Sequence, residues 1–174
     1  MNILPENHAL ATQDLDGVFE DLKATLRRAT QENQPLHEIE KAIWQELLRI
    51  GRQSLALVFQ SLGNGDRGET VTLPDGHCYQ QLEQEHPRRY VSIFGEFQLS
   101  RVVYGSREGQ KIEWVPLDNR LQLPASDFSY LLQDWDQSLC VEQAFGQART
   151  TVQRMLGLRQ SVDSLEHMNQ EMAQ

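Results

Sequence analysis

Residues 88–105 read RRYVSIFGEFQLSRVVYG. Two runs rich in β-branched and aromatic residues flank a Gly-Glu pair, and such runs favour strands. We expect Gly95 and Glu96 to form a two-residue hairpin turn, because glycine suits the first central position of a type II′ turn. This turn would set Phe94 opposite Phe97. Neither face of the predicted hairpin is purely apolar, so the pattern leaves open which face is buried.

Short strand-forming segments lie on both sides of this hairpin. Residues 71–73 alternate Val, Thr and Leu before the turn-forming Pro-Asp-Gly at 74–76. Residues 111–115 form another candidate strand, which Pro116 ends because proline cannot donate a ladder hydrogen bond. The middle of the chain is therefore predicted to be a small antiparallel sheet.

The segment before the sheet has the apolar spacing of α-helices. Apolar residues recur three or four positions apart over residues 15–26 and again over residues 36–57. Pro35 precedes the second run, where it suits the first residue of a helix, and Gly63 follows that run as a C-cap. We predict a helical hairpin, with a short dimerising coiled coil as the alternative.

The last third of the chain is predicted to be helical again. Ser126 or Asp127 would cap a first helix, Gly157 would end a second, and Ser161 would cap a third. Two helices joined by a short glycine turn have the outline of a helix-turn-helix. The sequence thus predicts an α+β protein with a helical hairpin over residues 1–66, a small antiparallel β-sheet over 67–123, and C-terminal helices with a helix-turn-helix outline over 124–174.

The composition limits the kinds of protein that the chain can be. With 174 residues, 39% hydrophobic and 24% charged, the chain fits one globular domain or two small ones. No apolar run reaches the length of a membrane span, and the N-terminus lacks a basic stretch followed by an apolar core. Cys78 and Cys140 lie far apart and suggest two reduced thiols. We expect a cytoplasmic protein without a membrane span.

Charge directs attention to the hairpin arginines. The net charge of -9 does not favour nucleic acid, but residues 71–120 are the least acidic part and five of their six cations are arginine. The predicted last helix is acidic and would be repelled by phosphates, whereas an arginine fork binds two phosphate oxygens. We predict that four arginines contact DNA phosphates and that two tyrosines stack or hydrogen-bond: Arg88, Arg89, Arg101, Arg107, Tyr90 and Tyr104.

No motif for catalysis is present. The sequence contains no phosphate-binding glycine loop, no GxSxG and no HExxH. Asp75, His77 and Cys78 lie beside a glycine, which favours a surface turn over a zinc site. We assign no catalytic residue, no metal and no cofactor, and a free-standing enzyme ranks last among the alternatives.

Four segments follow one another in a specific order: the hairpin at 88–105, VPLDNRLQLP at 115–124, SDFSYLLQDWDQSLCVEQAF at 126–145 and LGLRQSVDSLEHMNQEMA at 156–173. This order resembles the N-terminal region of insertion-sequence transposases of the ISKra type. The resemblance implies a DNA-binding and assembly module ahead of a catalytic domain of RNase H type. No acidic catalytic triad is recognisable here, so a truncated, split or separately made front end is expected.

The resemblance also implies partners. They are double-stranded DNA at the element ends, further copies of the chain, or a catalytic transposase subunit. Related sequences often carry cysteine pairs around the hairpin, and their absence here removes a zinc prediction. The alternative function is a protein-interaction module that dimerises or docks on a catalytic partner, which the apolar stripe of the N-terminal helices favours.

Overall fold

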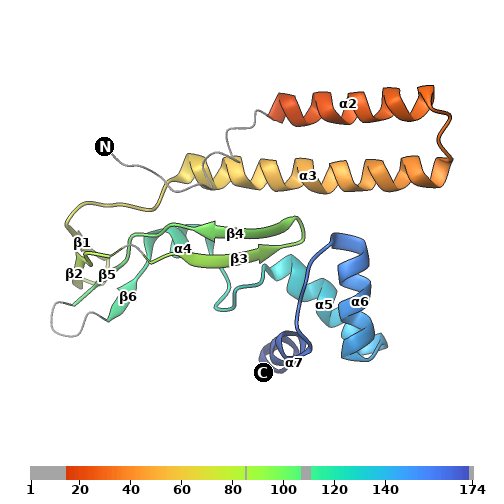
Figure 1. The fold of residues 1–174 in the computed structure, drawn as a ribbon. Helices are drawn as coiled ribbons and strands as arrows, with labels where there is room; N and C mark the ends of the chain where they lie inside the picture. The colour runs from red at the N-terminus through yellow and green to blue at the C-terminus, as the bar shows by residue number, and fades with distance from the viewer. Residues whose placement is uncertain (1–14, 85, 107–110, 173–174) are drawn as a thin grey trace. The chain divides into compact units, whose positions relative to one another are not determined.

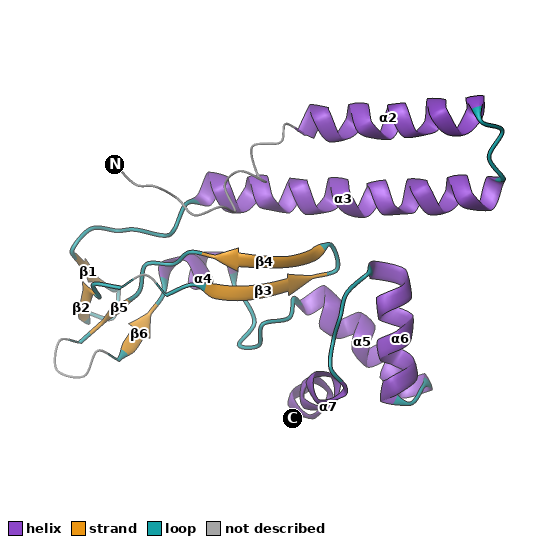
Figure 2. Ribbon diagram, viewed as in Figure 1, coloured by secondary structure: helices purple, strands orange, loops and turns teal. Residues whose placement is uncertain are grey.

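The computed structural model describes residues 15–84, 86–106 and 111–172 (Figure 1). The chain divides into two compact units, Met1–Ser61 and Leu62–Gln174. Helices and strands occupy separate stretches of the chain, as Figure 2 shows. The predicted α+β class is confirmed.

The first unit is a helical hairpin. Helix α2 spans Leu15–Gln31 and α3 spans Leu36–Leu62. Asn33 has a φ of 50°, a left-handed conformation that asparagine tolerates, and the chain reverses there. An ion pair of 2.6 Å between Arg49 Nη2 and Asp21 Oδ2 joins the two helices.

The second unit contains a four-stranded antiparallel sheet. Its strand order is β1-β2-β5-β6, with β1 at Thr70–Thr72, β2 at Cys78–Gln81, β5 at Tyr104–Gly105 and β6 at Ile112–Trp114. Strands were predicted at the first and last of these positions. Gly105 is required here, since a Cβ on it would lie 2.0 Å from the carbonyl oxygen of Lys111.

The central hairpin forms with a different register from the predicted one. Strand β3 covers Arg88–Ser92 and β4 covers Gly95–Leu99, with Ser92 opposite Gly95. The turn therefore lies at residues 93–94, and the prediction that Gly95 and Glu96 form it is wrong. The Ser92 hydroxyl stabilises the turn by accepting the Phe94 N–H at 3.1 Å.

The structure also shows which face of β4 is buried. The turn moves by two residues and each pairing partner therefore by four, an even number, so the side chains keep the faces that their alternation predicts. Phe97 and Leu99 are buried, whereas Glu96 and Gln98, which alternate with them along β4, are exposed. Val91 on β3 lies opposite Glu96, on the other face of the hairpin, and it is buried too. There the Val91 N–H donates to the Asp127 carbonyl and the Val91 carbonyl accepts the Ser129 N–H, each at 2.8 Å.

The run after β4 leaves the hairpin instead of continuing it. The Val102 N–H donates to the carbonyl of Asn64 and the Leu82 N–H donates to the carbonyl of Val103, each at 3.0 Å. Val102 and Val103 are buried. The second apolar run of the hairpin therefore supplies β4, a core segment and then β5.

Two helical features differ from the prediction. A short helix, α4 at Pro116–Leu121, follows the last strand and was not predicted. Helix α5 spans Tyr130–Glu142, and its cap is Ser129, whose hydroxyl accepts the Leu132 N–H at 3.2 Å. Ser126 and Asp127 do not cap it, because the chain there pairs with Val91.

The C-terminal helices pack on one another in pairs (Figure 1). Helix α6 spans Phe145–Leu156 and ends at Gly157, whose φ is 71°. Helix α7 spans Val162–Met172, and Ser161 caps it by accepting the Ser164 N–H at 3.0 Å. Both ends are as predicted. The core between the helices consists of Leu132, Ala148, Val152, Leu156, Leu158, Leu165 and Met168.

Within the described residues, no helix has both the length and the apolar character that crossing a membrane requires.

Candidate nucleic-acid interface

Arg88 and Arg101 hold the fold together at one carboxylate. Asp118 Oδ2 on α4 accepts from Arg88 Nη1 at 2.7 Å and from Arg101 Nη1. Arg88 also donates to the carbonyls of Pro124 and Ser126. The side chains of the two arginines are only 12% and 14% exposed. Their guanidinium groups are thus bound inside the protein, with little surface left for a phosphate.

Arg89 lies at the surface but has acidic neighbours. Its Nη2 is 2.9 Å from Glu96 Oε2 across the hairpin, and its Nη1 is 3.8 Å from Asp127 Oδ2. The guanidinium also lies 6.0 Å from the centre of the Phe128 ring. Hydrogen bonding to Glu96 raises the pKa of Arg89. A phosphate at this position would compete with two carboxylates.

The two predicted tyrosines are committed to internal contacts. Tyr104 has no exposed surface, and its hydroxyl accepts the Arg67 N–H at 2.8 Å and donates to the Gly68 carbonyl at 2.9 Å. Burial raises the pKa of Tyr90, which is half-buried. Arg107 lies outside the described residues. The five described residues of the predicted set are therefore not gathered into one exposed surface.

Exposed, cationic surface lies instead on helix α6. Arg149 and Arg154 are exposed, as is Arg159 in the turn that follows, and these are the only Lys or Arg residues after residue 120. None of the three forms an ion pair with a described residue. The α6 sequence FGQARTTVQRML contains no Asp or Glu, and its exposed residues Gln147 and Gln153 add polar amide groups.

Helix α7 presents the opposite charge. Asp163 and Glu166 on it are exposed, and the buried side of the helix carries Leu165 and Met168. A phosphate backbone would be attracted to α6 and repelled by α7. The sequence holds the signal for this difference, since α6 lacks acidic residues in a strongly acidic chain. Charge counts taken over large segments of the chain did not reveal it, because the acidic residues of α5 and α7 were counted together with α6.

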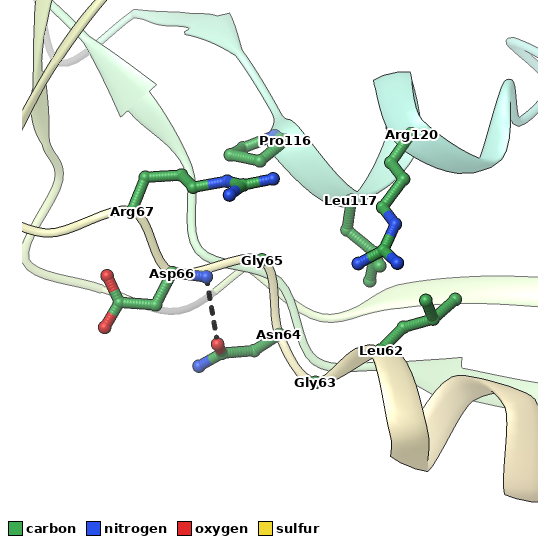
Figure 3. A pocket seen from close by; sticks show the side chains of 9 residues that line it. All are labelled: Leu62, Gly63, Asn64, Gly65, Asp66, Arg67, Pro116, Leu117 and Arg120. Carbon is green, nitrogen blue, oxygen red and sulfur yellow. Dashed lines mark hydrogen bonds between the residues drawn. The ribbon is translucent and has the colours of Figure 1, made fainter.

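A pocket of ≈ 210 Å³ lies between the loop that follows α3 and the start of α4 (Figure 3). Two arginines, Arg67 and Arg120, line it together with the glycines of the loop. Neither arginine was among the predicted contacts. No group of three or more His, Cys, Asp or Glu residues suited to a metal ion occurs in the part of the chain that the structure describes.

Comparisons of the chain with protein-family models, with curated proteins and with solved structures find no match.

Proposed function

We propose that the chain binds duplex DNA as the DNA-binding and assembly module of an insertion-sequence transposase. The observation that carries DNA binding is the exposed face of α6, which holds Arg149 and Arg154 without any acidic residue. Arginine forks bind phosphate oxygens in pairs, and exposed glutamine amides can bond to base edges. The transposase part of the proposal rests on the sequence resemblance over residues 89–173.

In this proposal the helix-turn-helix consists of α5 and α6 instead of α6 and α7, the pair predicted around the Gly157 turn, and α6 faces the DNA. Only Gln143 and Ala144 separate the two helices. Helix α7 then has a structural role, because Leu165 and Met168 on it fill the core and its exposed acids face away from phosphate. Contacts from α6 to phosphate would give affinity, and contacts to base edges would give sequence preference.

Fluorescence anisotropy with a labelled duplex, measured across a range of salt concentrations, tests the proposal. Each phosphate contact contributes about 0.9 to the slope of log K against log salt. The double variant Arg149→Gln, Arg154→Gln should weaken binding and reduce the magnitude of that slope by about 2. Enrichment of one sequence from a random pool of duplexes would identify the preferred site.

The matched control is Arg28→Gln on α2, which also removes an exposed arginine but lies in the first unit. It should leave both the affinity and the slope unchanged. DNA binding that is absent at low salt, or that falls equally in the control and in the double variant, would refute the role of α6.

A second candidate function is self-association through the first unit. Leu36, Leu47 and Val58 on α3 are 70%, 47% and 45% exposed, and they recur every eleven residues. Eleven residues make about three helical turns, so these side chains form a line along one side of α3. A second copy of the chain carries the same line and can cover it. The oligomeric state of the whole chain tests this candidate.

A further inference from the structure

We propose that the pocket between the 62–67 loop and α4 binds a phosphate group, held by Arg67 and Arg120. This inference stands on the pocket alone and does not depend on DNA binding by α6. Figure 3 shows the two guanidinium groups extending from opposite sides of the pocket toward Pro116 and Leu117. Two cationic forks converging on one small space form an arrangement that suits a multiply charged oxyanion.

Hydrogen bonds within the 62–67 loop and from the loop to the core hold it in place. The carbonyl of Asn64 accepts the Val102 N–H at 3.0 Å, and its side-chain oxygen accepts the Asp66 N–H at 3.2 Å. The Arg67 N–H donates to the buried Tyr104 hydroxyl at 2.8 Å. The backbone that carries Arg67 is thus fixed before any ligand arrives, which reduces the entropy cost of binding.

The opposite wall is fixed as well. Leu117 on α4 is buried, and Asp118 beside it is bonded to Arg88 and Arg101. Gly65 approaches this wall closely, since a Cβ on it would lie 3.0 Å from the Leu117 nitrogen. Arg120 therefore projects from a backbone that the core anchors, although its own side chain is exposed.

The carboxylates nearest in sequence to the two arginines have other partners. Asp66 lines the pocket but accepts the Gly68 N–H at 2.8 Å, and Figure 3 shows its carboxylate directed away from Arg120. Asp118 Oδ2 is occupied by Arg88 and Arg101, and Asp118 Oδ1 is buried. Neither Arg67 nor Arg120 forms an ion pair within the described parts of the chain. Both guanidinium groups are available to an external anion.

The size of the pocket sets the class of ligand. Its volume of ≈ 210 Å³ is below the roughly 300–1,000 Å³ of typical small-molecule sites. A single phosphate group fits this space, with any attached chain leaving through the open side. Inorganic phosphate and the 5′-phosphate at the end of a DNA strand present the same chemistry.

Titration of the isotope-labelled full chain with inorganic phosphate, followed by NMR at constant ionic strength, tests the proposal. We expect saturable shifts at the amides of the 62–67 loop and at the side-chain N–H of Arg67 and Arg120. Either Arg67→Gln or Arg120→Gln should weaken binding by about tenfold, as loss of a charged hydrogen bond does. Arg28→Gln, distant in sequence and in the other unit, should change nothing.

A pair of oligonucleotides that differ only at the 5′ end separates the two sources of phosphate. A 5′-phosphorylated oligonucleotide that saturates the loop signals at lower concentration than its 5′-hydroxyl counterpart identifies a strand end as the ligand. If the two oligonucleotides shift the loop signals equally while inorganic phosphate shifts them to saturation, free phosphate is the ligand. Shifts that rise linearly without saturation, or that persist unchanged in both pocket variants, overturn the proposal. Because these variants leave α6 intact, failure here is distinct from failure of DNA binding.

Discussion

Asp136 is a carboxyl group without exposed surface at the centre of the C-terminal helices. Its Oδ2 accepts from Gln160 Nε2 at 2.6 Å, and this bond joins α5 to the turn between α6 and α7. The other oxygen of each side chain, Asp136 Oδ1 and Gln160 Oε1, has no hydrogen-bond partner among the described residues. A proton on Asp136 Oδ1 would turn that oxygen from an acceptor into a donor.

Burial raises the pKa of Asp136 from 3.8 to about 6. The folded chain therefore binds this proton more tightly than the unfolded chain does. The stability that the protonated form contributes is complete below about pH 4 and is lost as the pH rises through about 6. Above that range the buried charge costs about 3 kcal/mol, since each pKa unit corresponds to about 1.4 kcal/mol.

We expect Asp136→Asn to raise the free energy of unfolding at pH 7.5 by about 1–3 kcal/mol. Asparagine keeps the shape of the side chain, carries no charge and can donate to Gln160 Oε1. Urea unfolding at several pH values from 4 to 8 measures the effect. The difference between variant and wild type should shrink as the pH falls, and a constant difference at every pH would contradict this explanation.

At the scale of elements, Asp118 joins α4 to two segments of the hairpin region. Its carboxylate bonds to Arg88 in β3 and to Arg101 after β4. Removing the negative charge leaves two nearly buried guanidinium groups without their shared partner. Breaking a buried ion pair from one side is strongly destabilising for this reason.

Asp118→Asn is expected to lower the free energy of unfolding by about 3 kcal/mol. Arg120→Gln on the same helix is exposed and unpaired among the described residues, so it should change stability by less than about 0.5 kcal/mol. Chemical denaturation followed by circular dichroism measures both variants. Equal stability of the two variants would show that Asp118 has no anchoring role.

Local signals in the sequence predicted the helices better than the sheet. Gly157 and Ser161 mark their helix ends correctly, because caps depend only on neighbouring residues. The hairpin turn was predicted two residues too far along the chain, because the glycine at Gly95 is typical of turns. The bond from the Phe94 N–H to the Ser92 hydroxyl, which stabilises the actual turn, is a weaker signal in the sequence. Helix α4 was missed because Asp118 is stabilised by arginines 30 and 17 positions away.

The candidate site depends on such distant contacts even more. Arginine composition pointed to the hairpin, but the carboxylates that occupy Arg88, Arg89 and Arg101 come from other elements. Glu96 lies within the hairpin itself, but no pattern within residues 88–105 reveals Asp118 as the partner of Arg88 and Arg101. The pocket joins a loop at residues 62–67 to α4, and only the folded chain brings Arg67 and Arg120 together.

At the scale of the whole molecule, the first unit is short of buried surface. Among the described residues of this unit, three are buried: Val18, Ala29 and Gln53. Helix α2 has 17 residues and α3 has 27, so α2 cannot cover the full length of α3. The line of Leu36, Leu47 and Val58 extends along the longer helix, and its burial in a dimer would add hydrophobic stabilisation.

We therefore predict that the full chain dimerises and that Leu47→Glu shifts it toward the monomer. Light scattering over a range of protein concentrations measures the mass. The matched control is Leu131→Glu on α5, since Leu131 is 49% exposed and Leu47 is 47% exposed. Wild-type protein that stays monomeric at every concentration would refute dimerisation, and equal loss in both variants would refute the α3 line as its site.

The carboxylate shared by Arg88 and Arg101 also limits how this sequence can evolve. Both arginines lose their shared charged partner if Asp118 changes, and losing the acid alone leaves two unbalanced charges inside the fold. Lysine is a poor replacement at Arg88, which also bonds two carbonyls. Substitution at one position should therefore be tolerated only when the other two change with it, and the three should be inherited as one set.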